Sequence, residues 1–185
     1  MFKKEKYMLE RSIMVLYHGS PESRAKKIIE KGEISNWCER IWKGNLDGKD
    51  IGTTDGYIYL SDKFSKAAFY GNASKVCCDE DSFYVFRINM DISELKQDAD
   101  ELRINCNINN ASYSAKESLD ICHCVSVGHC INKKEYSIEY MRIGKENPQL
   151  KKLVTDLCGK YKSESCLDPC EELEHINRVG KWVKM

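Results

Sequence analysis

The segment from Tyr57 to Gly71, YIYLSDKFSKAAFYG, constrains the fold of this 185-residue chain more than any other. Its first four residues are typical strand formers, and the Ser61-Asp62 pair that follows favours a turn and a helix start. Apolar and small residues then continue at helical spacing: Phe64, Ala67, Ala68 and Tyr70. The segment therefore predicts a strand that turns directly into a helix.

One tyrosine lies on the strand of this predicted unit and another lies on its helix. Tyr59 lies near the end of the strand, and Tyr70 lies on the helix that folds back from it. We therefore expect the two rings to face each other across a narrow slot. Flat cationic rings bind in such slots, because the faces of aromatic rings carry partial negative charge.

A second motif, His18-Gly19-Ser20, precedes this unit in the chain. The residues at 13–17 form the first predicted strand, which delivers His18 at its end. A glycine at this point lets the backbone approach a ligand closely. A helix is predicted next, from Pro21 to Lys31, with Gly32 ending it.

Together the two motifs resemble those of ADP-ribosyltransferases of the poly(ADP-ribose) polymerase (His-Tyr-Glu) type. The runs 59–62 and 65–68, with Tyr70, align with that family's nicotinamide-pocket segment without a gap. His18-Gly19-Ser20 matches the family's histidine motif. As an architecture, the resemblance covers roughly 15–143.

The resemblance implies NAD as a co-substrate. His18 would hydrogen-bond the adenine-side ribose, and the Gly19 backbone would hold the nicotinamide carboxamide. Tyr59 and Tyr70 would sandwich the nicotinamide ring. The implied cofactor-binding set is His18, Gly19, Ser20, Tyr59, Ala67 and Tyr70. The structural alternative is that His18 merely ends a strand and that the tyrosines are core aromatics.

The family's third element is a glutamate that bonds the nicotinamide-side ribose and orients the acceptor, and here the sequence departs from the pattern. Aligning Ser118-Leu119 with the family's serine-leucine pair puts His123 at the glutamate position. Anchoring on the last strand puts Val127 there instead. Neither residue is acidic, so the resemblance implies a mono-transferring or an inactive member rather than a polymerase.

Four nearby carboxylates are candidates for the missing acid: Glu117, Asp120, Glu135 and Glu139. Related transferases place the acid at the start of this strand, so Glu117 is the first candidate for a catalytic residue, together with His18 and Tyr59. Glu139 is the second candidate. For each of these carboxylates, a surface position without a role is the alternative.

The expected function is therefore an NAD-dependent mono-ADP-ribosyltransferase that modifies a macromolecular acceptor, as a toxin or effector. One alternative is a catalytically inactive module that binds NAD or ADP-ribose. Another is an RNA 2'-phosphotransferase-like enzyme, although its arginine-rich motifs are not evident. Whether the acceptor is protein or nucleic acid stays open, because Lys plus Arg equals Asp plus Glu at 29 each.

The remaining pattern predicts an α+β fold. Further strands are expected at 83–89, 121–131 and 136–143, and a helix at 149–157. The strand at 83–89 is almost continuously apolar and is expected to be central. Because there is no regular βαβ repeat, we predict a mixed, mainly antiparallel, ADP-ribosyltransferase-like split sheet with flanking helices.

The chain divides into three predicted parts. Residues 1–12 form a charged N-terminal extension, 13–145 form the ADP-ribosyltransferase-like domain, and 146–185 form a helical, Cys-containing C-terminal extension. Within the domain, 35–54 is expected to be a long surface loop. The extension is poor in apolar residues, so its removal is expected to leave the sheet folded.

The sequence also bears on cellular location and metal binding. No apolar run reaches the length of a membrane span and no signal-peptide core follows the start, so a cytoplasmic protein without a membrane partner is expected, or an effector secreted into a host cytosol. The ten cysteines are then expected to be mostly free thiols. No metal is predicted, because Cys158, Cys166, Cys170 and His175 lack a C-x-x-C pair.

Overall fold

The computed structural model describes residues 12–39, 41, 45–46, 49–50, 52–109, 112–160 and 167–185. The helices are α1 (Glu22–Lys31), α2 (Phe64–Cys77), α3 (Ala99–Cys106), α4 (Ala115–Cys122), α5 (Pro148–Lys160) and α6 (Pro169–Val179), with a 3-10 turn at Ile92–Glu94. The strands are β1 (Ile13–Pro21), β2 (Glu33–Ile34), β3 (Asn45–Leu46), β4 (Lys49–Asp50), β5 (Ile58–Ser61), β6 (Phe83–Asp91), β7 (Lys96–Gln97), β8 (Cys124–Val127), β9 (Ile131–Asn132), β10 (Ser137–Ile143) and β11 (Val183–Lys184).

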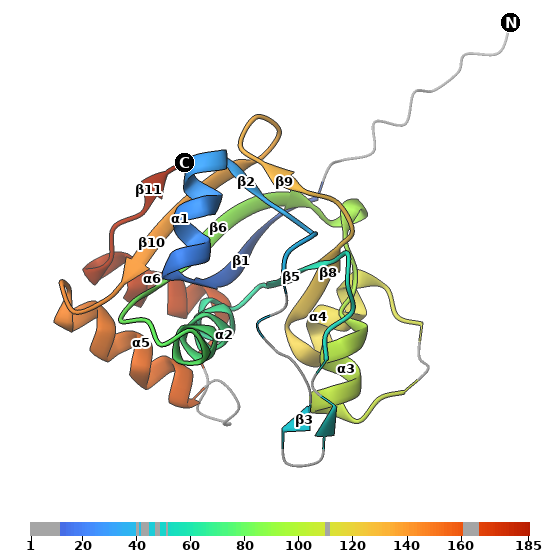
Figure 1. Ribbon diagram of the computed structural model, residues 1–185. Helices are drawn as coiled ribbons and strands as arrows, with labels where there is room; N and C mark the ends of the chain where they lie inside the picture. The colour runs from blue at the N-terminus through green and yellow to red at the C-terminus, as the bar shows by residue number, and fades with distance from the viewer. Residues whose placement is uncertain are drawn as a thin grey trace, which may run out of the picture.

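The main sheet has seven strands in the order β11-β10-β6-β1-β5-β8-β7, and its pairings are antiparallel (Figure 1). This confirms a mixed α+β fold with a mostly antiparallel sheet. The β6 strand lies between β10 and β1 and is largely buried, as its apolar sequence predicts. By contrast, β1 and β5 pair only at Tyr17 and Ser61. The sheet is therefore held together weakly at this point, where His18 follows Tyr17.

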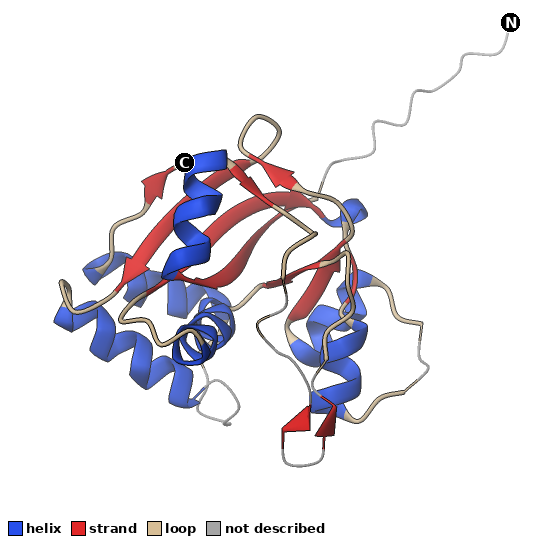
Figure 2. Cartoon of the chain, in the orientation of Figure 1, coloured by secondary structure: helices blue, strands red, loops and turns tan. Residues whose placement is uncertain are grey.

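Helices cover both faces of the sheet (Figure 2). On one face, α1 packs Ala25 and Ile28 against Leu16 and Phe86. On the other face, α2, α5 and α6 enclose a second cluster, which includes Phe64, Val85, Met141, Leu150 and Ile176. The α3 and α4 helices lie at the end of the sheet formed by β8 and β7 (Figure 1).

The C-terminal segment belongs to this core, so the expectation of an appended extension at 146–185 is wrong. Its helix at 149–157 is confirmed as α5, in which Leu150, Val154 and Leu157 recur at helical spacing and are buried. Ile176 of α6 is fully buried, and β11 pairs with β10. The segment has few apolar residues, but Leu150, Val154, Leu157 and Ile176 all face the core.

The strand predicted at 121–131 is also corrected. The α4 helix extends to Cys122, and His123 ends it in the left-handed conformation with φ 56°. Only Cys124–Val127 then forms a strand in the main sheet, while Ile131 pairs with β2 in a small second sheet. A helix followed by a short strand gives the same alternation of apolar and polar residues as one longer strand. The loop predicted at 35–54 similarly contains the paired strands β3 and β4.

The described cysteines are free thiols, as expected: Cys38, Cys77, Cys78, Cys106, Cys122, Cys124, Cys130, Cys158 and Cys170. Within the described ranges, no three His, Cys, Asp or Glu side chains are grouped so as to hold a metal ion. Cys166 and residues 1–11 lie outside those ranges. Among the helices that the structure describes, none has the length and apolar character needed to cross a membrane.

Candidate functional site

His18 is fixed to the strand that carries Tyr59. Its Nδ1 lies 3.0 Å from the Tyr59 carbonyl oxygen. A carbonyl oxygen only accepts hydrogen bonds, so in the neutral ring Nδ1 carries the proton and Nε2 is left as an acceptor. Burial lowers the pKa of His18 below its usual 6.5 and so favours the neutral form. The imidazole is therefore prepared to accept a hydrogen bond from a hydroxyl group.

Gly19 allows β1 and α2 to touch backbone to backbone. A Cβ atom on Gly19 would lie 1.9 Å from the Ala67 carbonyl oxygen and 2.7 Å from the Gly71 nitrogen. Such distances are far below van der Waals contact, so no other residue fits without moving α2. Gly19 is thus explained by helix packing, and the same contact brings the histidine motif next to Ala67.

Ser20 is 1% exposed, and its hydroxyl has no hydrogen-bond partner among the described residues. A buried hydroxyl left unpaired typically costs about 1–3 kcal/mol. The fold itself therefore does not account for a serine at this position.

Tyr59 and Tyr70 are linked through α3. The Tyr59 hydroxyl donates to Asp100 and lies 3.0 Å from the Thr54 carbonyl oxygen. The Tyr70 hydroxyl donates to Glu101 over 2.5 Å. Burial, and next the hydrogen bond to Asp100, raise the pKa of Tyr59, so it stays a donor. Both half-buried rings are thus anchored to consecutive residues of one helix.

A buried ion pair completes this network. Lys66 Nζ lies 2.7 Å from Glu101 Oε1, and both side chains are less than 10% exposed. Lys66 also donates to the Cys122 carbonyl oxygen over 2.5 Å, which ties α2 to the end of α4. Because a buried charge is costly without partners, these contacts fix α2, α3 and α4 relative to one another.

Sequence reasoning missed the contribution of α3. The signal available was acidic residues at 98, 100 and 101, but acidic residues are ordinary in the first turn of a helix. Asp98 does act as the N-cap of α3, accepting a hydrogen bond from the Glu101 backbone over 2.8 Å. Nothing in the sequence distinguishes Asp100 and Glu101, which reach the tyrosines, from such caps.

Glu117, the first candidate for the catalytic acid, lies elsewhere and has a structural role. Its carboxylate accepts hydrogen bonds from the Ser114 backbone and hydroxyl, at 2.8 and 2.7 Å, and forms a capping box that begins α4. These bonds lower the pKa of Glu117. His123 lies at the opposite end of the same helix, about 9 Å along its axis. Among the described residues, no hydrogen bond or ion pair joins Glu117 to His18 or Tyr59.

The other candidate carboxylates also lie apart from His18. Glu139 pairs with Arg87, which lies in register with Tyr17. Side chains in register point to the same face of a sheet, and those of neighbours along a strand point to opposite faces. Glu139 therefore lies on the Tyr17 face of the sheet, and no hydrogen bond or ion pair joins it to His18 among the described residues. Asp120 and Glu135 are exposed.

His123 stands at the position that the alignment gives to the family's glutamate, and it does have an acidic partner. Its Nδ1 lies 3.0 Å from Asp62 Oδ1, and Asp62 follows β5 directly. Asp62 was part of the aligned run, but the sequence did not indicate that it pairs with His123.

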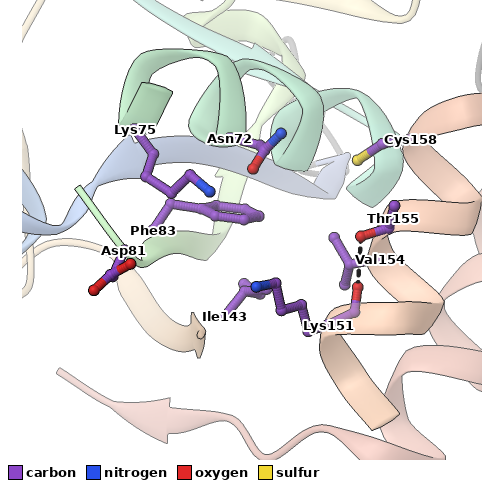
Figure 3. Close-up of a pocket in the computed structure, with 9 residues that line it drawn as sticks. All are labelled: Asn72, Lys75, Asp81, Phe83, Ile143, Lys151, Val154, Thr155 and Cys158. Atoms are coloured by element: carbon purple, nitrogen blue, oxygen red, sulfur yellow. Dashed lines mark hydrogen bonds between the residues drawn. The ribbon is translucent and has the colours of Figure 1, made fainter. Parts of the chain in front are cut away.

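A small hollow lies between α2, α5 and the ends of β6 and β10 (Figure 3). It is lined by Asn72, Lys75, Asp81, Phe83, Ile143, Lys151, Val154, Thr155 and Cys158. Its volume of about 70 Å³ is below the several hundred Å³ of a typical ligand pocket. None of the motif residues lines it, so we do not assign it to the site.

No family model matches the sequence, and neither a curated protein nor a solved structure matches it. The resemblance to ADP-ribosyltransferases is therefore carried by the motif residues alone.

Proposed function

We propose that the protein is an NAD-dependent mono-ADP-ribosyltransferase that modifies a protein or nucleic acid acceptor, in the cytoplasm or, as a toxin or effector, in a host cytosol. The observation that carries the proposal is the convergence of distant motif segments. His18 bonds the Tyr59 carbonyl, and Gly19 packs directly on Ala67. The two tyrosine hydroxyls meet consecutive residues of α3.

These residues have chemistry that fits NAD. The acceptor Nε2 of His18 suits a ribose hydroxyl, and the Ser20 hydroxyl, which has no partner among the described residues, supplies one further polar group nearby. The rings of Tyr59 and Tyr70 suit the cationic nicotinamide ring, which aromatic faces attract. Transfer breaks the bond between nicotinamide and ribose, and positive charge then develops on the sugar.

Binding of NAD is the first test. A ligand that binds only the native state raises the melting temperature by mass action, about 2.7 kcal/mol of stabilisation at a concentration 100 times its Kd. We expect NAD to raise the melting temperature of the parent protein and Tyr70→Ala to lose most of that shift. Tyr136→Ala is the matched control, because Tyr136 also bonds a glutamate, Glu94, outside the site.

A turnover assay with labelled NAD decides between an enzyme and a binding module. Radiolabelled NAD, incubated with the protein and a cell lysate, should yield nicotinamide and a labelled acceptor, which protease or nuclease then classifies. The position of Glu117 favours one alternative, a module that binds NAD or ADP-ribose without turnover. A melting temperature that saturating NAD leaves unchanged would contradict both readings.

A further inference from the structure

Asp62 and His123 form a pair at the end of the β5–β8 ladder. Ser61 is in register with Cys124, so the next residue on one strand and the preceding residue on the other lie side by side. The Asp62 carboxylate and His123 Nδ1 are 3.0 Å apart, with side chains 20% and 38% exposed. A carboxylate accepts the Nδ1 proton, so Nε2 is the free acceptor of the neutral ring.

This Nε2 atom is available to another molecule. The His123 ring makes no further hydrogen bond within the part of the chain that the structure describes. An imidazole oriented by a buried or half-buried carboxylate, with its other nitrogen open, is the arrangement that general bases use.

The pair is attached to the proposed NAD site through the backbone. Asp62 lies three residues after Tyr59, about 10 Å along an extended chain. On the other side, Lys66 donates to the carbonyl of Cys122 and pairs with Glu101, which in turn accepts from Tyr70. Asp62 is therefore three residues from Tyr59, and His123 follows Cys122, whose carbonyl binds the lysine that pairs with Glu101, the partner of Tyr70.

The backbone at His123 is held in an unusual conformation. Its φ of 56° is in the left-handed region, which non-glycine residues seldom adopt and in which His, Asn and Asp are enriched. The conformation ends α4 and turns the chain into β8. A glycine would satisfy the backbone at least as well, so the helix end alone does not require an imidazole.

We propose that Asp62 and His123 act as the general base of the proposed transferase, in place of a catalytic glutamate. His123 Nε2 removes the proton from the attacking nucleophile of the acceptor, or from water in NAD hydrolysis. The new bond forms to the anomeric carbon, and the bond from that carbon to the nicotinamide nitrogen breaks. Its electron pair neutralises the pyridinium nitrogen, and nicotinamide leaves. Asp62 stabilises the imidazolium, which then releases its proton to solvent.

This inference depends on the proposed function, and the decisive variant is His123→Gly. Glycine keeps the left-handed backbone and leaves a space where the ring was. We expect transfer and NAD hydrolysis to fall by about 10²–10⁴-fold, the usual contribution of a general base, with the Kd for NAD changed less than about threefold. Free imidazole should restore part of the turnover, which a purely structural role would not predict.

Two further variants separate catalysis from folding. His123→Asn also tolerates the left-handed backbone and should lose turnover without gaining from imidazole. Asp62→Asn keeps the shape but disrupts the orientation of the ring, so turnover should fall at least about tenfold. His129→Ala is the control, since this half-exposed histidine bonds Tyr136 and should leave turnover unchanged.

Each outcome has one meaning. Full turnover by His123→Gly would overturn the role of the pair and leave the proposed function intact. If His123→Gly loses both turnover and NAD binding, and imidazole does not rescue it, His123 has only a positioning role. That outcome would also overturn the role of the pair. A parent protein that binds NAD but turns none over would overturn the general base and leave a binding module. A parent that binds no NAD would overturn both proposals.

Discussion

Gly19 is the residue on which the placement of the candidate site depends most. It lies where β1 and β5 separate and where α2 crosses β1 at backbone distance. Ser20 next to it is buried and has no hydrogen-bond partner among the described residues, and His18 before it is held by Tyr59. Three consecutive residues thus have three different physical roles: a fixed acceptor, a close contact and an unused hydroxyl.

Gly19→Ala should be strongly destabilising. The added methyl group would overlap the Ala67 carbonyl oxygen, so α2 must move. Overpacking of this kind costs about 1–3 kcal/mol or more in the free energy of unfolding, measured by urea denaturation. Gly159→Ala is the control, because apart from its own helix backbone no described residue lies within 4 Å of its added Cβ. That variant should gain about 0.5–1 kcal/mol from helix propensity. Equal stability of the two variants would contradict the close contact.

Glu117 should behave as a helix cap. Glu117→Ala removes the carboxylate that bonds Ser114 and should cost about 0.5–2 kcal/mol in the free energy of unfolding. Glu117→Gln keeps the capping box, so its stability and its NAD turnover should match those of the parent. A hundredfold loss of turnover in Glu117→Gln, measured as nicotinamide release, would instead restore the catalytic role expected from the sequence.

Among the elements, α2 is the one that links the site to the rest of the molecule. Lys63, at its N-cap, provides no side-chain hydrogen bond to the first turn. Glu172 of α6 provides it instead, accepting hydrogen bonds from the Ser65 backbone over 3.0 Å and from the Ser65 hydroxyl. The C-terminal helix therefore satisfies the N-terminus of the helix that carries Tyr70.

Glu172→Ala should consequently weaken both the fold and the site. The side chain is 1% exposed, and its loss leaves buried donors of Ser65 unpaired, at a cost of about 1–3 kcal/mol in the free energy of unfolding. Urea denaturation measures this cost, and the NAD-induced rise in melting temperature should shrink as α2 loosens. Glu171→Ala, at the exposed neighbouring position, should change neither quantity. A variant of Glu172 with parental stability would show that α2 does not need this cap.

At the level of the whole molecule, the described part of the chain is built around the seven-stranded sheet, and the C-terminal helices complete its core. Leu150, Val154, Leu157 and Ile176 are buried against one face of the sheet. Burial of such side chains contributes about 1.5–3 kcal/mol each. Their sum, about 6–12 kcal/mol, is comparable to the total stability of a typical domain.

Removal of residues 146–185 should therefore abolish the native fold. The truncated chain would expose Phe64, Met141 and Ile143, which these helices cover. We expect it to be insoluble, or to lose its near-ultraviolet circular dichroism while retaining far-ultraviolet signal. A truncated protein with a sharp near-ultraviolet spectrum and a cooperative melting transition would show instead that the segment is an independent appendage.

The sequence by itself determined the local units. The strand that turns into a helix at 57–71, the apolar strand at 83–89 and the helix at 149–157 follow from periodicity and turn residues, which act over a few positions. The structure confirms these three units as β5 with α2, β6 and α5.

The tertiary structure alone decided which of these units share a core and which polar groups meet. The pairing of Asp62 with His123, the anchoring of Tyr59 and Tyr70 on α3, and the burial of Ile176 each join residues far apart in the chain. Such contacts depend on the sheet order and on the packing of helices, which leave no periodic signal in the sequence. For that reason the sequence predicted a catalytic role for Glu117, which caps α4. It also predicted an appended extension for the residues that form the core helices α5 and α6.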